Sequence, residues 1–250
     1  MFRQSNWERY KPAMLGLPAN RELTREDLMA EPYLMGRHGK LSMYFAPHNE
    51  LVNEHAELVI VGITPGWTQM RIAFETAVQR FRRGESDEQI AAAAKHQARF
   101  AGAMRRNLYA MLHELGIPGL FGLADPEQLF EAHAELLHTT SLLRYPVFYG
   151  GRNYSGSQPK LTNESWLLDA AFRYTLEDLQ ALKQPLIIPL GKRVESVLEL
   201  FIQHGVINAG QLLKGFPHPS GANGHRQRQF GEQAERMRRI MLQWHVNRAR

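Results

Sequence analysis

The sequence of 250 residues contains no cysteine. This absence excludes a disulfide framework, an iron–sulfur cluster held by thiolates, a cysteine zinc finger and a cysteine nucleophile. No apolar run reaches the ~18 residues that a membrane-spanning helix needs. Residues 1–10 are polar and lack the apolar stretch of a secretory signal. We therefore expect a cytoplasmic protein without a membrane partner.

Two nucleotide-binding motifs are also missing, the Gly-x-Gly-x-x-Gly fingerprint and the Walker Gly-Lys-Ser/Thr. Their absence disfavours a small-molecule enzyme built on a Rossmann-like sheet, which is kept only as a minor alternative. His113, His133 and His138 lie in one region, but no acidic residue accompanies them at ligand spacing. The sequence therefore predicts neither a metal site nor a cofactor.

The chain carries a moderate positive charge. Lys and Arg number 30 against 25 Asp and Glu, a net charge of +5, and only 7 of the 30 are lysine. Arginine binds phosphate with two parallel hydrogen bonds and stacks on bases, so this bias favours a nucleic-acid partner. GC-rich coding or ordinary solubility explains the same composition equally well.

Short apolar runs alternate with segments of helical periodicity. Strands are predicted near residues 57–63, 136–145, 186–191 and 212–216. Helices are predicted over 68–83, 90–115 with a break near Gly102, 163–182, 192–204 and 227–246. We expect one monomeric domain over residues 1–250, in which residues 1–45 form a helical extension. The alternation predicts an α/β fold, a three-layer α/β/α sandwich around a central, mainly parallel, four-stranded sheet. Ligands of such sheets bind beyond the carboxyl ends of the strands.

Two loops at predicted strand ends are candidates for chemistry. The first runs Gly62-Ile63-Thr64-Pro65-Gly66-Trp67, and its glycines allow a sharp turn and close approach to a ligand. The second contains His218-Pro219-Ser220, whose prolines hold the backbone around the histidine. Taken singly, each loop fits an ordinary structural turn. Together, both at strand ends, they are expected to line one cleft.

This pair resembles the uracil-DNA glycosylase superfamily, in which a Gly-x-(Asp, Asn, Ala or Glu)-Pro-(Gly or Tyr) loop comes early and a His-Pro-Ser loop comes late. The stretch from Ala46 to Asn53 is also similar. The resemblance implies an enzyme that flips a non-standard base out of DNA and hydrolyses its N-glycosidic bond, leaving an abasic site. It implies that His218 donates a hydrogen bond to the base. The DNA-binding loop that it implies comprises Ser220, Gly221, Ala222, Asn223, His225 and Arg226.

The first motif departs from the family pattern at its third position. Many members have Asp or Asn there to position the attacking water, whereas this chain has Thr64. A threonine hydroxyl orients water but does not take its proton at neutral pH. Thr64 is kept as a catalytic candidate, and a non-catalytic DNA-binding relative is kept as the alternative. Branches of the family that hold an iron–sulfur cluster are excluded by the missing cysteines.

The residues that would contact the base also depart from the family pattern. The resemblance assigns Gly62, Ile63, Pro65, Gly66 and Ser141 to the base, and Trp67 to stacking on it or to the core. No Asn occurs in residues 138–141, where the family places its uracil reader, so Asn153 is the candidate substitute. The tyrosine-rich loop around Asn153 suits a bulky base such as the glucosylated hydroxymethylcytosine of phage DNA. Uracil repair and antiviral defence both stay open as functions. The loop itself also fits an ordinary surface loop whose tyrosines pack on the core.

Overall fold

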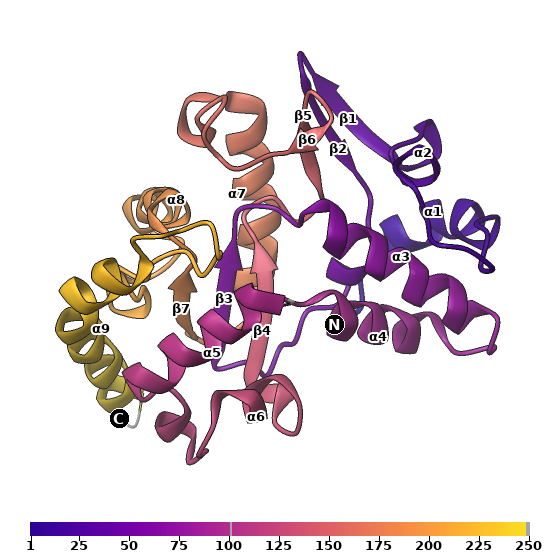
Figure 1. The fold of residues 1–250 in the computed structure, drawn as a ribbon. Coiled ribbons are helices and arrows are strands. Elements are labelled where there is room, and N and C mark those ends of the chain that lie inside the picture. The colour runs from indigo at the N-terminus through magenta and orange to yellow at the C-terminus, as the bar shows by residue number, and fades with distance from the viewer. Residues whose placement is uncertain (101, 249–250) are drawn as a thin grey trace. The chain divides into compact units, whose positions relative to one another are not determined.

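The computed structural model describes residues 1–100 and 102–248. Their contacts divide the chain into two compact units, each built from stretches that are separate in sequence (Figure 1). Unit 1 contains Met1–Val52, Thr64–Arg99 and Leu143–Ala171. Unit 2 contains the described parts of Asn53–Ile63, Phe100–Leu142 and Phe172–Arg250. The single domain over residues 1–250 stays a prediction.

Unit 1 combines helices with an antiparallel sheet of strand order β1-β2-β5-β6. Its strands are β1 (Leu34–His38), β2 (Leu41–Tyr44), β5 (Val147–Tyr149) and β6 (Arg152–Asn153). Its helices are α1 (Gln4–Leu15), α2 (Arg25–Leu28), α3 (Trp67–Phe81), α4 (Asp87–Ala98) and the first part of α7 (Ser165–Gln180). Stacked and edge-on aromatic rings fill its interior, with Phe45 in contact with Tyr10, Phe74 and Tyr145.

The helical extension expected over residues 1–45 is wrong for residues 34–44, which form β1 and β2. Gly39 has φ +56° in the turn between these strands. The tyrosine-rich loop expected around Asn153 likewise contains β5 and β6, joined by Gly150 and Gly151 with φ +55° and +76°. Positive φ at both central residues is typical of a two-residue hairpin turn. The sequence does not predict these short strands, because they pair with one another and none forms a long run of alternating apolar and polar residues.

Unit 2 contains a parallel sheet with β3 between β4 and β7 (Figure 1). Its strands are β3 (Leu58–Gly62), β4 (Leu137–Ser141) and β7 (Leu186–Pro189). Its helices are α5 (Gly102–Leu115), α6 (Pro126–Phe130), α8 (Lys192–Gln203), α9 (Arg226–Arg248) and the second part of α7. The α/β class is therefore confirmed, and the helix boundaries lie close to those predicted.

The expected fourth parallel strand at residues 212–216 is not formed. Leu212 makes an isolated parallel bridge with Ile187, and the segment then leaves regular strand geometry. Gly215 has φ +95°, and its N–H donates to the Glu195 carboxylate at 2.6 Å. A strand cannot continue through that conformation, so within the described residues the parallel sheet has three strands.

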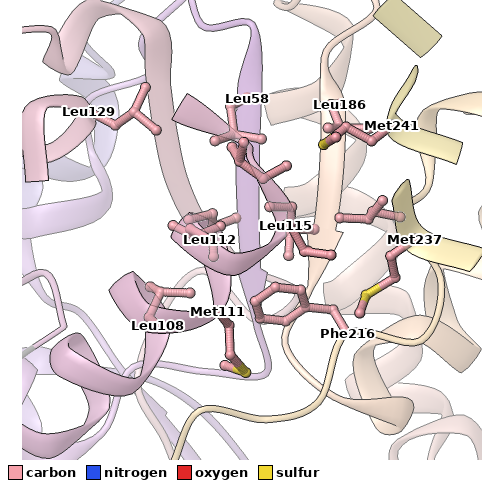
Figure 2. Packing of buried hydrophobic residues seen from close by; sticks show 14 of the residues in the cluster. Leu58, Leu108, Met111, Leu112, Leu115, Leu129, Leu186, Phe216, Met237 and Met241 are labelled. Atoms are coloured by element: carbon pink, nitrogen blue, oxygen red, sulfur yellow. The ribbon is translucent and has the colours of Figure 1, made fainter. Parts of the chain in front are cut away.

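Side chains alternate between the two faces of the parallel sheet. On one face, Leu58 of β3 and Leu186 of β7 belong to a cluster with α5 and α9, in which Phe216 also packs (Figure 2). On β4, Leu137 joins this cluster, whereas Thr140 donates to the buried Asp178 of α7 at 2.7 Å. Neighbouring strand residues point to opposite faces. Helices therefore pack against both faces of this sheet.

Of the helices within residues 1–100 and 102–248, none is both long enough and apolar enough to traverse a bilayer.

Candidate functional site

The carboxyl edge of the unit 2 sheet gathers several of the predicted site residues. Gly62 ends β3 and is in register with Ser141, which ends β4. A Cβ on Gly62 would lie 3.3 Å from Ser141 Oγ, so the glycine permits this close approach. His218 lies at the same edge, because Gly191, just after β7, contacts it: a Cβ on Gly191 would stand 3.1 Å from His218 Cβ. The start of the first motif, which belongs to unit 2, and the His218 motif thus lie at the same edge of the sheet.

The His218 ring is held in one orientation. The Ser220 backbone N–H donates to His218 Nδ1 at 3.2 Å, so in the neutral ring the proton belongs on Nε2. Burial lowers the pKa of His218 from its ordinary value, and the positive charge of Arg193 lowers it further. The ring is therefore a neutral hydrogen-bond donor rather than a cation at physiological pH.

The segment after His218 folds back on itself. The Asn223 amide donates to His218 O at 3.1 Å and to Gln229 Oε1 at 3.0 Å. Arg226 Nη1 donates to Ser220 O at 3.1 Å. Two side chains predicted to contact DNA thus hold the loop itself. Three others, Gly221, Ala222 and His225, are exposed, as a contact surface requires, and their DNA-binding role stays a prediction.

The Thr64 side chain lies in unit 1 and is engaged by the backbone there. Its Oγ1 donates to Tyr145 O at 2.9 Å and accepts from the Val147 N–H at 2.9 Å. The hydroxyl hydrogen is therefore already used, and only one oxygen lone pair is left for a water. This geometry ties the first motif to the start of β5. Its proposed water-orienting role stays a prediction.

Unit 1 also brings Asn153 beside the end of the first motif. Asn153 Oδ1 accepts from the Trp67 N–H at 3.0 Å, and its Nδ2 is the nearest atom to a Cβ built on Gly66, at 3.2 Å. Asn153 thus satisfies one of the first N–H groups of α3. Pro65, between Thr64 and Gly66, is buried. The structure therefore joins Asn153 to Gly66 and Trp67, an association that the sequence suggested only by elimination.

No pattern in the sequence pointed to Arg25, whose guanidinium lies over the Trp67 ring. The Arg25 guanidinium lies 4.9 Å from the Trp67 ring centroid and donates to Gly151 O at 2.8 Å. One face of the indole is thereby covered by a cation, so a stacked base would have to use the other face. The contact joins residues 42 positions apart, which no local motif encodes.

Gly191 is a second residue that the sequence identified only as a strand-exit turn. Its φ of +90° and ψ of 164° are accessible essentially to glycine alone. We expect Gly191→Ala to lower the free energy of unfolding by about 1–3 kcal/mol through backbone strain and to displace His218. Urea unfolding measures the first effect. Gly231→Ala in α9 is the matched control, because no atom lies within 4 Å of its Cβ site; equal stability of the two variants would contradict the prediction.

In the described part of the chain, no group of three or more His, Cys, Asp or Glu side chains is placed to hold a metal ion.

Comparison with known proteins identifies one curated relative. No family model matches the chain, and no solved structure matches it. The chain is similar to "Uncharacterized protein YoxB" of Bacillus subtilis (strain 168): the two are 43% identical over 218 residues, which cover 87% of this chain and 85% of YoxB. The chain belongs to the same family as YoxB.

Proposed function

We propose that this protein is a DNA glycosylase that flips a non-standard base out of DNA and hydrolyses its N-glycosidic bond, leaving an abasic site. The observation that carries the proposal is the Ser220 N–H bond to His218 Nδ1, with the lowered pKa of that ring. Both features favour a neutral imidazole that donates from Nε2. The position of His218 at the carboxyl edge, with Gly62 and Ser141, supports the same role.

The chemistry needs such a donor. When the glycosidic bond breaks, positive charge develops on the sugar and negative charge on the departing base. A neutral N–H aimed at a base carbonyl stabilises the negative charge without adding a cation beside the sugar. Water supplies the oxygen that replaces the base. We assign the hydrogen bond to His218, base contacts to the Gly62–Gly66 loop, Trp67, Ser141 and Asn153, and DNA contacts to the exposed loop after Ser220.

The substrate is tested with a panel of oligonucleotides that contain uracil, hypoxanthine, hydroxymethylcytosine or its glucosylated form. Abasic-site formation on any of them supports the proposal. Release of uracil or hypoxanthine points to repair, whereas release of the glucosylated base alone points to defence against phage. The unmodified duplex is the control. No base release from any substrate, at enzyme concentrations that saturate DNA binding, would overturn the catalytic proposal.

A non-catalytic DNA-binding relative is the second candidate, and one observation favours it. The Thr64 hydroxyl donates to Tyr145 O and accepts from the Val147 N–H. Many members of the uracil-DNA glycosylase superfamily have a water-positioning acid at this place in the motif, whereas here the side chain is used to hold the backbone. Such a protein would bind modified DNA tightly and with strong salt dependence, yet release no base. The same oligonucleotide panel, read by binding and by abasic-site formation, separates the two candidates.

We propose a three-layer glycosylase-like domain in which the segment around Leu212, bridged to Ile187, takes the place of a fourth strand. We further propose a cytoplasmic monomer that acts on DNA without a cofactor or a membrane. Sedimentation tests the monomeric state, and cell fractionation tests the cytoplasmic location.

A further inference from the structure

Three consecutive carbonyl oxygens in the His218 loop are each held by a side-chain donor. Asn223 Nδ2 donates to His218 O, and Arg226 Nη1 donates to Ser220 O. Between them, Asn107 Nδ2 of α5 donates to Pro219 O at 2.9 Å. Asn107 is 112 positions from Pro219 and belongs to neither motif.

The bond from Asn107 has a special consequence because of peptide geometry. Pro219 C=O and Ser220 N–H belong to the same peptide unit. A trans peptide is planar, and its C=O and N–H point in opposite directions. Holding Pro219 O on the α5 side therefore turns the Ser220 N–H the other way, toward His218 Nδ1, where it is found at 3.2 Å.

We propose that Asn107 is a positioning residue for His218: by fixing the Pro219–Ser220 peptide, it keeps the ring proton on Nε2. If the peptide rotates, Nδ1 loses its donor and the Nδ1–H form becomes accessible. A ring in that form presents a lone pair at Nε2 and repels a base carbonyl. Asn223 and Arg226 act on neighbouring carbonyls and do not belong to this peptide. The effect on base release rests on the proposed function, whereas the effect on the ring does not.

The full-length protein, labelled with ¹⁵N, tests the proposal by NMR. The His218 ring signals are assigned by their loss in His218→Gln, and the tautomer is read from the Nδ1 and Nε2 shifts. We expect the Nε2–H form alone in the wild type and a measurable Nδ1–H fraction in Asn107→Asp, which has the same shape but no donor. Asn107→Ala removes the donor without adding charge and carries the test if Asn107→Asp does not fold.

Ala110→Asp is the matched control, since it places the same charge at an exposed position of α5. It is expected to leave the tautomer unchanged. If the wild type releases a base, its kcat should fall about threefold to tenfold in the Asn107 variants, the range of one lost hydrogen bond, with Kd for DNA within twofold. An unchanged tautomer in both Asn107 variants overturns the positioning role, whatever the activity. If the tautomer changes in the Asn107 variants but the wild type releases no base, the positioning role is supported and the proposed glycosylase activity is overturned.

Discussion

Replacing His218 with alanine is expected to lower the rate of base release by about 10²–10³-fold, the usual effect of removing one donor from a developing anion. The affinity for DNA should change little, because the exposed loop after Ser220 is retained. Single-turnover kinetics on the substrate found in the oligonucleotide panel measures the first effect, and equilibrium binding measures the second. His218→Gln, which keeps an N–H donor, should recover part of the rate. Full activity of His218→Ala would place the catalytic centre elsewhere.

The pH profile of the same reaction follows from the environment of His218. Burial, and then the charge of Arg193, lowers the pKa of the ring. The neutral, donating form therefore persists below pH 6.5, and activity should decline only as the pH falls through that lowered pKa. Arg193→Ala removes one of the two causes, so its acidic decline should begin at a higher pH.

Acid is expected to destabilise the protein through His48, a residue outside the proposed site. His48 is only 4% exposed, and within the described residues neither ring nitrogen has a hydrogen-bond partner. Burial, with a smaller contribution from Lys95, lowers its pKa from 6.5 to about 3. The folded ring therefore stays neutral at pH values where the unfolded chain takes up a proton.

The direction of the pH effect follows by linkage. The stabilisation is fully present above pH 6.5 and is lost as the pH falls from 6.5 toward 3, by up to about 1.4 kcal/mol per pH unit. His48→Phe has no group to protonate and keeps a ring of similar size. Between pH 7.5 and 4.5, the wild type should lose about 2–3 kcal/mol more stability than His48→Phe. Urea unfolding at both pH values measures this difference, and equal losses in the two proteins would show that His48 does not carry it.

Most of the secondary structure of unit 2 could be predicted from the sequence. The apolar run that ends at Gly62 is a strand, and the periodic segments over residues 192–204 and 227–246 are the helices α8 and α9, because burial of one face requires those periods. The break near Gly102 also occurs, between α4 and α5. The segment 212–216 was predicted wrongly because the positive φ of Gly215 and its bond to Glu195 depend on tertiary neighbours.

The candidate site, too, could be predicted only in part from the sequence. His218, flanked by prolines, was identifiable from the sequence, as was the glycine-rich first motif. The hydrogen-bond partners of individual polar side chains could not be identified from the sequence. Asn223 and Arg226 donate to carbonyl groups of their own loop, and the Thr64 hydroxyl accepts from the first residue of β5. Side-chain donors choose among acceptors by distance, and distance is known only once the chain is folded.

By itself, the sequence determined the α/β alternation, the missing thiol chemistry and the two loops at strand ends, since each follows from residue type or local period. Only the tertiary structure decided that Thr64 contacts Tyr145 across 81 positions and that Asn107 reaches Pro219 across 112. Such contacts form because packing the core brings remote backbone groups within about 3 Å. Local sequence places no constraint on which remote group that is, so the orientation of the His218 ring is a property of the fold.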